Sequence, residues 1–161
     1  NAVNFFKTCA QFFTHHMNQP TDEREWQQGA QSQRRVDRKQ DDIANLKHQL
    51  SSTFDVSVTG SICDLEQQDQ REALIDEIVR DGQDLNILMN NAAFVGTSSL
   101  SGWNAPFVEQ SIETWRRALE VNLVAPFELC QGMSQIMKNS RGANMINIAS
   151  IYGQYGPDWR M

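Results

Sequence analysis

The sequence predicts an α/β fold: a Rossmann-like three-layer sandwich with a mostly parallel sheet that is incomplete at both ends. Two observations lead to this prediction. From about Val36 onward, helical patterns alternate with short apolar runs, in the order expected of parallel βαβ units with right-handed crossovers. Polar residues follow the apolar runs directly, and ligands bind beyond the carboxyl ends of strands in such sheets.

The spacing of apolar residues places the individual elements. Ile43, Leu46 and Leu50 lie three and four residues apart behind two acidic residues, which indicates a surface helix. Gly82 is suited to end a second helix, because glycine readily adopts the left-handed conformation found at helix ends. We therefore expect helices over about residues 41–50, 66–81 and 111–138, and strands over about residues 56–62, 85–89 and 145–148.

The chain divides into two unequal parts. Residues 1–35 are polar, glutamine-rich and poorly patterned, so they are left without an assigned fold, and poor order is one outcome for them. Residues 36–161 form the predicted Rossmann-type domain. Ser32-Gln33-Arg34-Arg35 directly precedes this domain, and four such residues would be costly to bury in a strand.

Composition excludes several classes of function. The formal net charge of −6 argues against a general nucleic-acid or membrane-surface binder, and the apolar runs are too short to span a bilayer. Cys9, Cys63 and Cys130 are widely spaced, which favours reduced thiols in the cytoplasm over disulfides or a zinc site. His15 and His16 are sequence neighbours that point in different directions, so no metal site is predicted.

Two polar groups follow the first two clear strands of the domain. Asp64 and Leu65 come after the first, where the carboxylate can accept hydrogen bonds from an adenine amino group or can cap the next helix. Capping is the commoner role, and both can hold. The run Asn90-Asn91-Ala92-Ala93 comes after the second, where amides and small side chains suit either contact with a ribose or a structural turn.

The long helix contains Asn122 and then Pro126. Proline has no N–H to donate to the carbonyl four residues earlier, so a break is expected that leaves the Asn122 carbonyl available for a water molecule or a polar group. A packing kink with a solvated asparagine explains the pattern equally well. Ser150 ends the last strand, where its hydroxyl can bond a substrate oxygen; no G-x-S-x-G elbow surrounds it.

The order and spacing of these residues resemble the short-chain dehydrogenase/reductase family over residues 36–161. Asn90-Asn91-Ala92-Ala93 is similar to the family's N-N-A-G, with alanine in place of the glycine. Asn122 and Ser150 match a catalytic asparagine and serine. Asp64 and Leu65 match the pair beside the adenine, and Asp37 falls where the family reads the ribose.

This resemblance implies hydride transfer between a nicotinamide cofactor, NAD or NADP, and the carbon of a small carbonyl or alcohol substrate. It implies that Ser150 holds the substrate oxygen and that Asn122 anchors a water of a proton relay. Asp37 favours NAD, because a carboxylate repels a 2′-phosphate, whereas Arg38 favours NADP. The family also implies a homo-oligomer when the protein is complete. Tyr152-Gly153 followed by Gly156-Pro157-Asp158-Trp159 is similar to a branch of the family associated with bacterial surface-sugar biosynthesis.

Two parts of the family pattern are missing. No glycine precedes Gly29, although the family needs a glycine-rich turn there to approach the pyrophosphate. No lysine follows Lys138, so neither Tyr152 nor Tyr155 belongs to a Tyr-x-x-x-Lys pair. We therefore expect a fragment of an oxidoreductase that is inactive by itself. A non-catalytic interaction module is the alternative.

Overall fold

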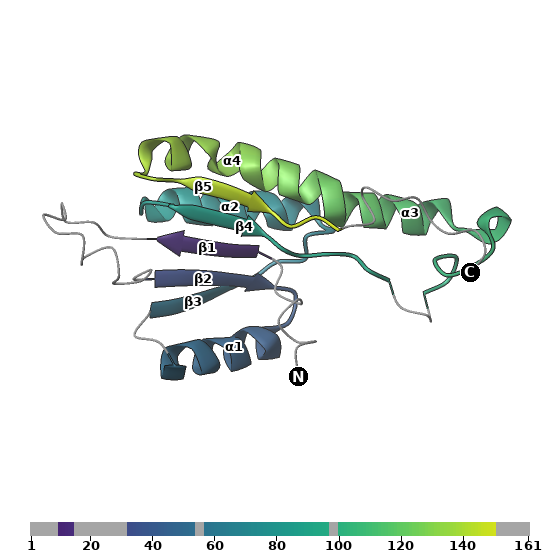
Figure 1. The fold of residues 1–161 in the computed structure, drawn as a ribbon, viewed down its shortest axis with the longest axis horizontal. Helices are drawn as coiled ribbons and strands as arrows, with labels where there is room; N and C mark the ends of the chain where they lie inside the picture. Colours follow the sequence, from purple (N-terminus) through teal and green to yellow (C-terminus); the bar gives the residue numbers. More distant parts are fainter. Residues whose placement is uncertain (1–9, 15–31, 54–56, 97–99, 151–161) are drawn as a thin grey trace, which may run out of the picture.

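The computed structural model describes residues 10–14, 32–53, 57–96 and 100–150. Helices and strands alternate along most of the described chain (Figure 1). In chain order, the elements are β1 Ala10–Thr14, β2 Ser32–Asp37, α1 Gln40–Thr53, β3 Ser57–Ile62, α2 Gln68–Asp81, β4 Ile87–Asn90, the 3₁₀ helix η3 Phe107–Glu109, α3 Ile112–Leu119, the π-helical segment η4 Glu120–Val124, α4 Ala125–Asn139 and β5 Asn144–Asn147.

The five strands form one sheet in the order β3-β2-β1-β4-β5. β2 pairs with β3 and β4 pairs with β5 in parallel, whereas β1 lies antiparallel to both of its neighbours. Four strands therefore share one direction, which confirms the predicted mostly parallel Rossmann-like sheet. The order follows the doubly wound pattern, in which the connection between β3 and β4 crosses the sheet. The sequence did not predict β1.

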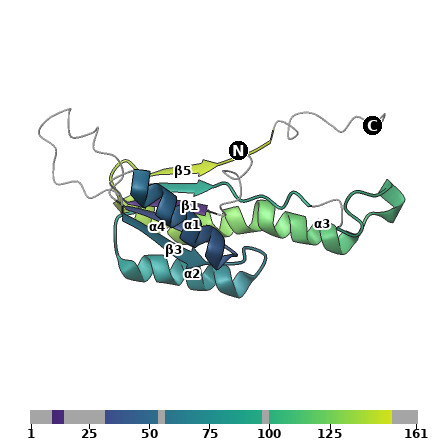
Figure 2. The same cartoon turned by 90° about the horizontal axis from the view of Figure 1, so that it is seen from below.

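The alternation of side chains along β3 shows that α1 and α2 lie on opposite faces of the sheet. Gly60 faces α1, because a Cβ atom on this glycine would lie 2.2 Å from Cγ2 of Ile43. Its neighbour Ser61 faces α2, where its hydroxyl contacts the Glu77 carboxylate at 3.3 Å. α4 packs beside α2, which completes the three layers (Figure 2).

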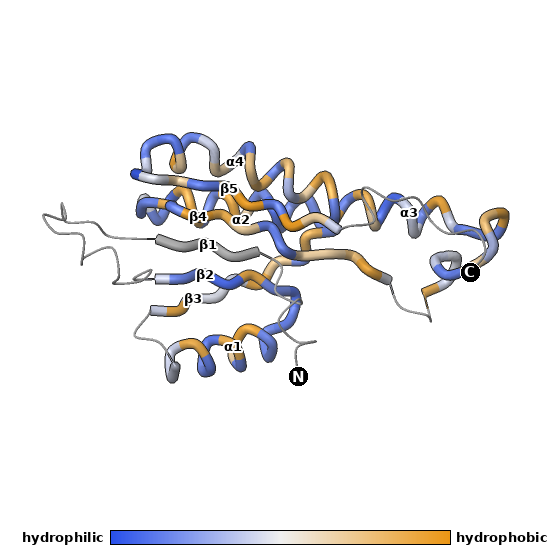
Figure 3. The backbone as a smooth tube through the Cα atoms, viewed as in Figure 1, coloured by the Kyte–Doolittle hydropathy of each residue, from blue (hydrophilic) through white to orange (hydrophobic). Residues whose placement is uncertain are grey.

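The hydrophobic core lies between the sheet and the α2–α4 layer. Its buried residues come from β2, from β4, from the segments that follow β3 and precede β4, and from both helices. They are Val36, Cys63, Leu65, Leu74, Ile78, Leu85, Leu88, Ala125, Leu129, Met133 and Met137. Figure 3 shows orange apolar positions alternating with blue polar ones along α2 and α4, as expected of helices with one buried face.

The amino-terminal half of β2 consists of polar residues, and not all of their side chains are buried. The expectation that Ser32-Gln33-Arg34-Arg35 resists a strand is wrong, because β2 begins at Ser32. The Arg34 guanidinium turns toward α2 and pairs with the Glu77 and Asp81 carboxylates. The domain boundary expected between residues 35 and 36 therefore falls inside a strand.

The ends of the helices follow their local sequence. Gly82 adopts a left-handed conformation with φ of 64° at the end of α2, as predicted. Ser111 caps α3, because its hydroxyl oxygen accepts a hydrogen bond from the Thr114 backbone N–H. Within the part of the chain that the structure describes, no helix has the length and apolar character needed to cross a bilayer.

Burial controls the chemistry of the core thiol. Cys63 is fully buried, and burial raises the pKa of its thiol to about 11, with a further contribution from the neighbouring Asp64 carboxylate. The folded protein therefore holds this proton to higher pH than the unfolded chain does. Between about pH 9 and 11 the folded state binds more protons, so the thiol lowers the free energy of unfolding as pH rises through that range.

Replacing Leu129 by alanine should destabilise the protein by about 2–5 kcal/mol, because this side chain is fully buried between α4 and the sheet. Urea unfolding followed by circular dichroism measures the change. Leu123→Ala is the matched control, since Leu123 is 62% exposed on the same long helix, and its cost should stay under about 1 kcal/mol. Equal losses in the two variants would contradict the placement of the core.

The Cys63 thiol should react with iodoacetamide at pH 8 at least about tenfold more slowly in the folded chain than in urea. Mass spectrometry of the Cys63 peptide measures both rates. A second readout is stability: Cys63→Ala should flatten the decline of the free energy of unfolding between about pH 9 and 11. Rapid folded-state labelling, or an unchanged decline, would show that this thiol is not buried as described.

Candidate functional site

The carboxyl ends of β2, β3, β4 and β5 lie at one edge of the sheet, on the side toward α3 (Figure 1). Backbone hydrogen bonds tie the segments that leave these strands. The Cys63 N–H donates to the Asp37 carbonyl at 3.0 Å, and the Ile148 N–H donates to the Asn90 carbonyl at 2.9 Å. The residues predicted after each strand therefore gather along this edge.

Asp37 is the last residue of β2 and is buried. Its Oδ1 accepts a hydrogen bond of 3.1 Å from the Lys39 backbone N–H. Burial raises the pKa of this carboxyl and outweighs the opposing effect of the Lys39 N–H. The carboxyl end of β2 therefore presents a buried carboxylate.

Asp64 begins a turn rather than a helix. Its Oδ1 accepts from the Glu66 N–H at 3.1 Å, and its carbonyl accepts from the Gln67 N–H at 2.9 Å. α2 starts at Gln68, and no side chain caps it, so the interpretation of Asp64 as its N-cap is wrong. The turn holds Leu65 with its side chain in the core and its carbonyl directed at Arg71.

Asn90 at the end of β4 joins three elements. It is buried, and its Nδ2 donates to Asn147 Oδ1 of β5 at 2.8 Å and to Cys130 Sγ of α4 at 3.4 Å. These contacts give Asn90 a structural function at the edge. Asn91 and Ala92, which follow, are half-buried.

Asn122 lies within η4, where the long helix departs from regular α-helical bonding. The Ala125 N–H donates to the Glu120 carbonyl five residues earlier, which defines a π turn. The predicted break before Pro126 is therefore confirmed, and its form is a π segment. Breaks of this kind occur frequently at functional sites.

The Asn122 side chain spans the gap between the helix and the loop after β4. Its Oδ1 accepts from the Phe94 backbone N–H at 2.7 Å, and its Nδ2 donates to the Phe94 carbonyl at 3.1 Å. This pair of bonds attaches Asn122 to the loop that directly follows the run Asn90–Ala92. Ser150 is exposed at the end of the described chain, two residues beyond the last bond to β4.

Two arginines that the sequence did not single out connect this edge to the helices. Arg71 is only 1% exposed and bonds the Leu65 carbonyl together with the Glu120 and Glu128 carboxylates. It shares the apolar stripe of α2 with Leu74 and Ile78. An arginine at helical spacing on an apolar stripe is the signal that could have identified it, since a buried guanidinium needs several acceptors.

Arg117 of α3 forms the second connection. Its Nε donates to Glu66 Oε1 at 2.6 Å, and its guanidinium carbon lies 5.4 Å from the centre of the Phe94 ring. The Phe94 ring also meets Trp103 edge to face, with ring centres 5.5 Å apart. Arg117 thus joins the turn after β3 to the loop after β4.

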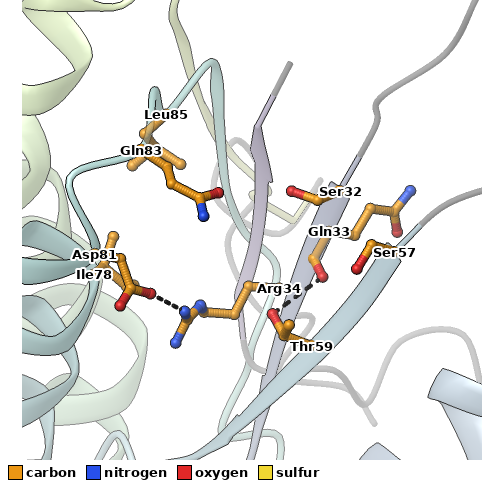
Figure 4. A pocket seen from close by; sticks show the side chains of 9 residues that line it. All are labelled: Ser32, Gln33, Arg34, Ser57, Thr59, Ile78, Asp81, Gln83 and Leu85. Atoms are coloured by element: carbon orange, nitrogen blue, oxygen red, sulfur yellow. Dashed lines mark hydrogen bonds and ion pairs between the residues drawn. The ribbon is translucent and has the colours of Figure 1, made fainter. Parts of the chain in front are cut away.

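A separate cavity lies at the opposite edge of the sheet, beside the amino-terminal ends of β2 and β3 (Figure 4). Its lining includes Ser32, Arg34, Ser57 and Asp81, and the Arg34 guanidinium is paired with that aspartate. The cavity therefore contains none of the residues predicted to form the site, and its arginine is already neutralised.

Comparison with known proteins agrees with this geometry. A family model described as short chain dehydrogenase matches residues 23–160. A tropinone reductase homolog of Arabidopsis thaliana is 38% identical over 98 residues, which cover 60% of this chain and 34% of the relative. Glucose 1-dehydrogenase 2 of Bacillus subtilis is 27% identical over 92 residues, covering 56% of this chain and 33% of that protein. The chain thus spans about a third of the length of these relatives.

Solved structures show the same fold. L-sorbose reductase from Gluconobacter frateurii, solved with NADPH and L-sorbose, has a TM-score of 0.64 at 27% identity, covering 77% of this chain and 44% of that one. NAD+-bound xylitol dehydrogenase has a TM-score of 0.63 at 22% identity, over 76% of this chain and 44% of that one. The match over residues 23–160 shows that the chain belongs to the short chain dehydrogenase family.

Proposed function

We propose that this chain carries the substrate-orienting edge of a nicotinamide-dependent oxidoreductase, in which hydride passes between the nicotinamide ring and the carbon of a carbonyl or alcohol. One observation carries the proposal. The Asn122 side chain binds both backbone groups of Phe94, so a π segment in the long helix is joined to the loop after β4. Family membership supports this type of reaction.

The proposed roles of Asn122 and Ser150 follow from their positions at the site edge. Both polar atoms of the Asn122 side chain are bonded to Phe94, so the backbone carbonyl is the group that would hold a water molecule. Pro126 has no N–H to donate to that carbonyl. Ser150, on the segment after β5, would hold the substrate oxygen with its hydroxyl. The sequence contains no Tyr-x-x-x-Lys pair, so we assign proton transfer to no residue of this chain.

The residues fit one part of a nicotinamide dinucleotide and not another. Asp37, Asp64 and Leu65 lie at the edge where the ribose and adenine would bind, and Asn90, Asn91 and Ala92 follow at the next strand. The pyrophosphate does not fit. β1 is antiparallel, so its carboxyl end at Thr14 faces the opposite edge, and no glycine precedes Gly29.

We favour NAD over NADP for the complete protein, because the buried Asp37 carboxylate would repel a 2′-phosphate. The exposed Arg38 opposes this preference. A small carbonyl or alcohol is the proposed substrate class. This class includes sugars, and L-sorbose is the ligand of one similar reductase. The two cysteines that the structure describes are free thiols, which supports a cytoplasmic location.

A non-catalytic interaction module is the alternative, and one surface favours it. Apolar side chains recur every three or four residues along α3, η4 and the start of α4, and they remain between 43% and 67% exposed. Such a continuous apolar stripe is suited to pairing with a second helix. The stripe consists of Ile112, Trp115, Leu119, Leu123 and Phe127. The same surface would serve a homo-oligomer of the complete enzyme.

The purified chain should show negligible dehydrogenase turnover and no saturable binding of NADH or NADPH below about 1 mM, because the pyrophosphate lacks its backbone cradle. Fluorescence titration of the reduced cofactors measures this, with the Asp37→Ser variant as the control for the ribose contact. Saturation in the micromolar range that Asp37→Ser weakens would contradict the proposed loss of cofactor binding.

Light scattering separates the two candidate functions. A fragment of an enzyme should associate heterogeneously through its exposed stripe, and Phe127→Glu should reduce that association, because a charge there opposes apolar contact. Lys138→Glu, at the exposed end of the same helix, is the control for added charge. A single stable oligomer that binds no cofactor would favour the interaction module instead.

A further inference from the structure

Arg71 contacts three separate segments with three different nitrogens. Its Nη1 donates to the Leu65 carbonyl at 2.6 Å, its Nη2 to Glu120 Oε1 at 2.6 Å, and its Nε to Glu128 Oε2 at 2.5 Å. The side chain is almost completely buried, so each of these acceptors offsets part of the cost of removing the guanidinium from water. One side chain of α2 therefore joins the turn after β3 to both ends of the helix break.

Glu120 is the first residue of the π segment and Glu128 lies beyond its end in α4, so the segment changes the relative direction of the two side chains. Glu120 and Glu128 are eight residues apart. In a regular α-helix, residues eight apart point about 80° away from each other around the axis. A π turn accommodates one extra residue, so the pair takes the spacing of residues seven apart and differs by only about 20°. The π segment thus brings both carboxylates to the face that meets Arg71.

The Arg71 guanidinium is suited to binding both carboxylates in this arrangement. It is planar and rigid, and its donors diverge in fixed directions, so it binds two carboxylates only when both are correctly placed. Burial lowers the pKa of the Arg71 side chain, but the hydrogen bonds that it donates to Glu128 and Glu120 more than compensate, and the net shift is upward. The group therefore remains a cation throughout the pH range in which the protein is folded.

We infer that Arg71 is a positioning residue: by binding Glu120 and Glu128 together it holds the long helix in its π form, and so keeps Asn122 bonded to Phe94. A regular helix would rotate the residues on one side of the break by about 100° relative to the other side. The pair of bonds to the Phe94 backbone would then be lost. The importance of Asn122 rests on the proposed function, whereas its placement by Arg71 does not.

The test is hydrogen exchange of the Phe94 N–H in the full chain, measured by ¹⁵N NMR together with the Asn122 side-chain amide signal. Arg71→Met should speed exchange of the Phe94 N–H by about tenfold and shift the Asn122 signal, because the clamp on the π segment is removed. Arg34→Met is the matched control. This substitution breaks two ion pairs with α2 at the opposite edge of the sheet. It should leave the exchange rate of the Phe94 N–H within about twofold of that in the unsubstituted chain.

One further variant separates geometry from charge. Arg71→Met combined with Glu120→Gln and Glu128→Gln removes the repulsion that unpaired carboxylates would cause. We expect Phe94 exchange to remain about tenfold faster in this triple variant, since the guanidinium is still absent. Recovery to the unmodified rate would overturn the inference, because charge balance alone would then hold the break.

Should Arg71→Met fail to fold, Glu128→Gln tests the same clamp more gently, because Arg71 keeps its bonds to Leu65 and Glu120. Exchange of the Phe94 N–H should rise by roughly threefold, and an unchanged rate would contradict the inference. No cofactor or substrate enters these measurements. Saturable cofactor binding, which would contradict the proposed function, therefore leaves the result on Arg71 standing, and the reverse also holds.

Discussion

The organisation of the site edge depends on one local departure from regular helical bonding, the π turn at Glu120–Val124. Without it, Asn122 would not reach the loop after β4, and the long helix would be only a layer covering the sheet. The turn has no stability of its own, because a π turn is a rare form of helix. Its neighbours stabilise it. Pro126 removes a competing α-helical hydrogen bond, and polar contacts from the sheet edge stabilise the π form.

The remaining features of the edge connect to this turn. The turn after β3 reaches it through Arg71, and the loop after β4 reaches it through Phe94. Arg117 connects the same two loops from α3. Side chains from the helices therefore hold the turn after β3 and the loop after β4 above an apolar core. Such contacts favour fixed positions, which the proposed hydride transfer between two bound molecules would require.

The sequence was informative where the periodic spacing of apolar residues and local backbone chemistry determine the structure. The helices and strands from α1 to β5 were predicted because apolar spacing determines which faces are buried, and Gly82 ends α2 as its conformational freedom suggested. Pro126 predicted the break, but not its π form, since that depends on side chains from another helix. The capping role of Asp64 was mistaken because the turn it begins places Gln67, and not the carboxylate, at the start of α2.

The sequence could not identify contacts between residues that lie far apart along the chain. β1 is a strand because two neighbours pair with it, and its residues show no strand pattern of their own. Arg34 tolerates β2 because carboxylates of α2, more than forty residues away, neutralise it. Arg71 was not singled out for the same reason: its three acceptors lie on segments that only the fold brings together.

The account depends most directly on the bonding of Ala125, and coupling across hydrogen bonds measures it. In ¹⁵N- and ¹³C-labelled protein, the Ala125 amide nitrogen should show a through-hydrogen-bond coupling to the carbonyl carbon of Glu120, five residues earlier. Such a coupling would establish the π turn on which the placement of Asn122 rests. A coupling from Ala125 to the carbonyl of Val121, four residues earlier, would show a regular α-helix and would contradict the account.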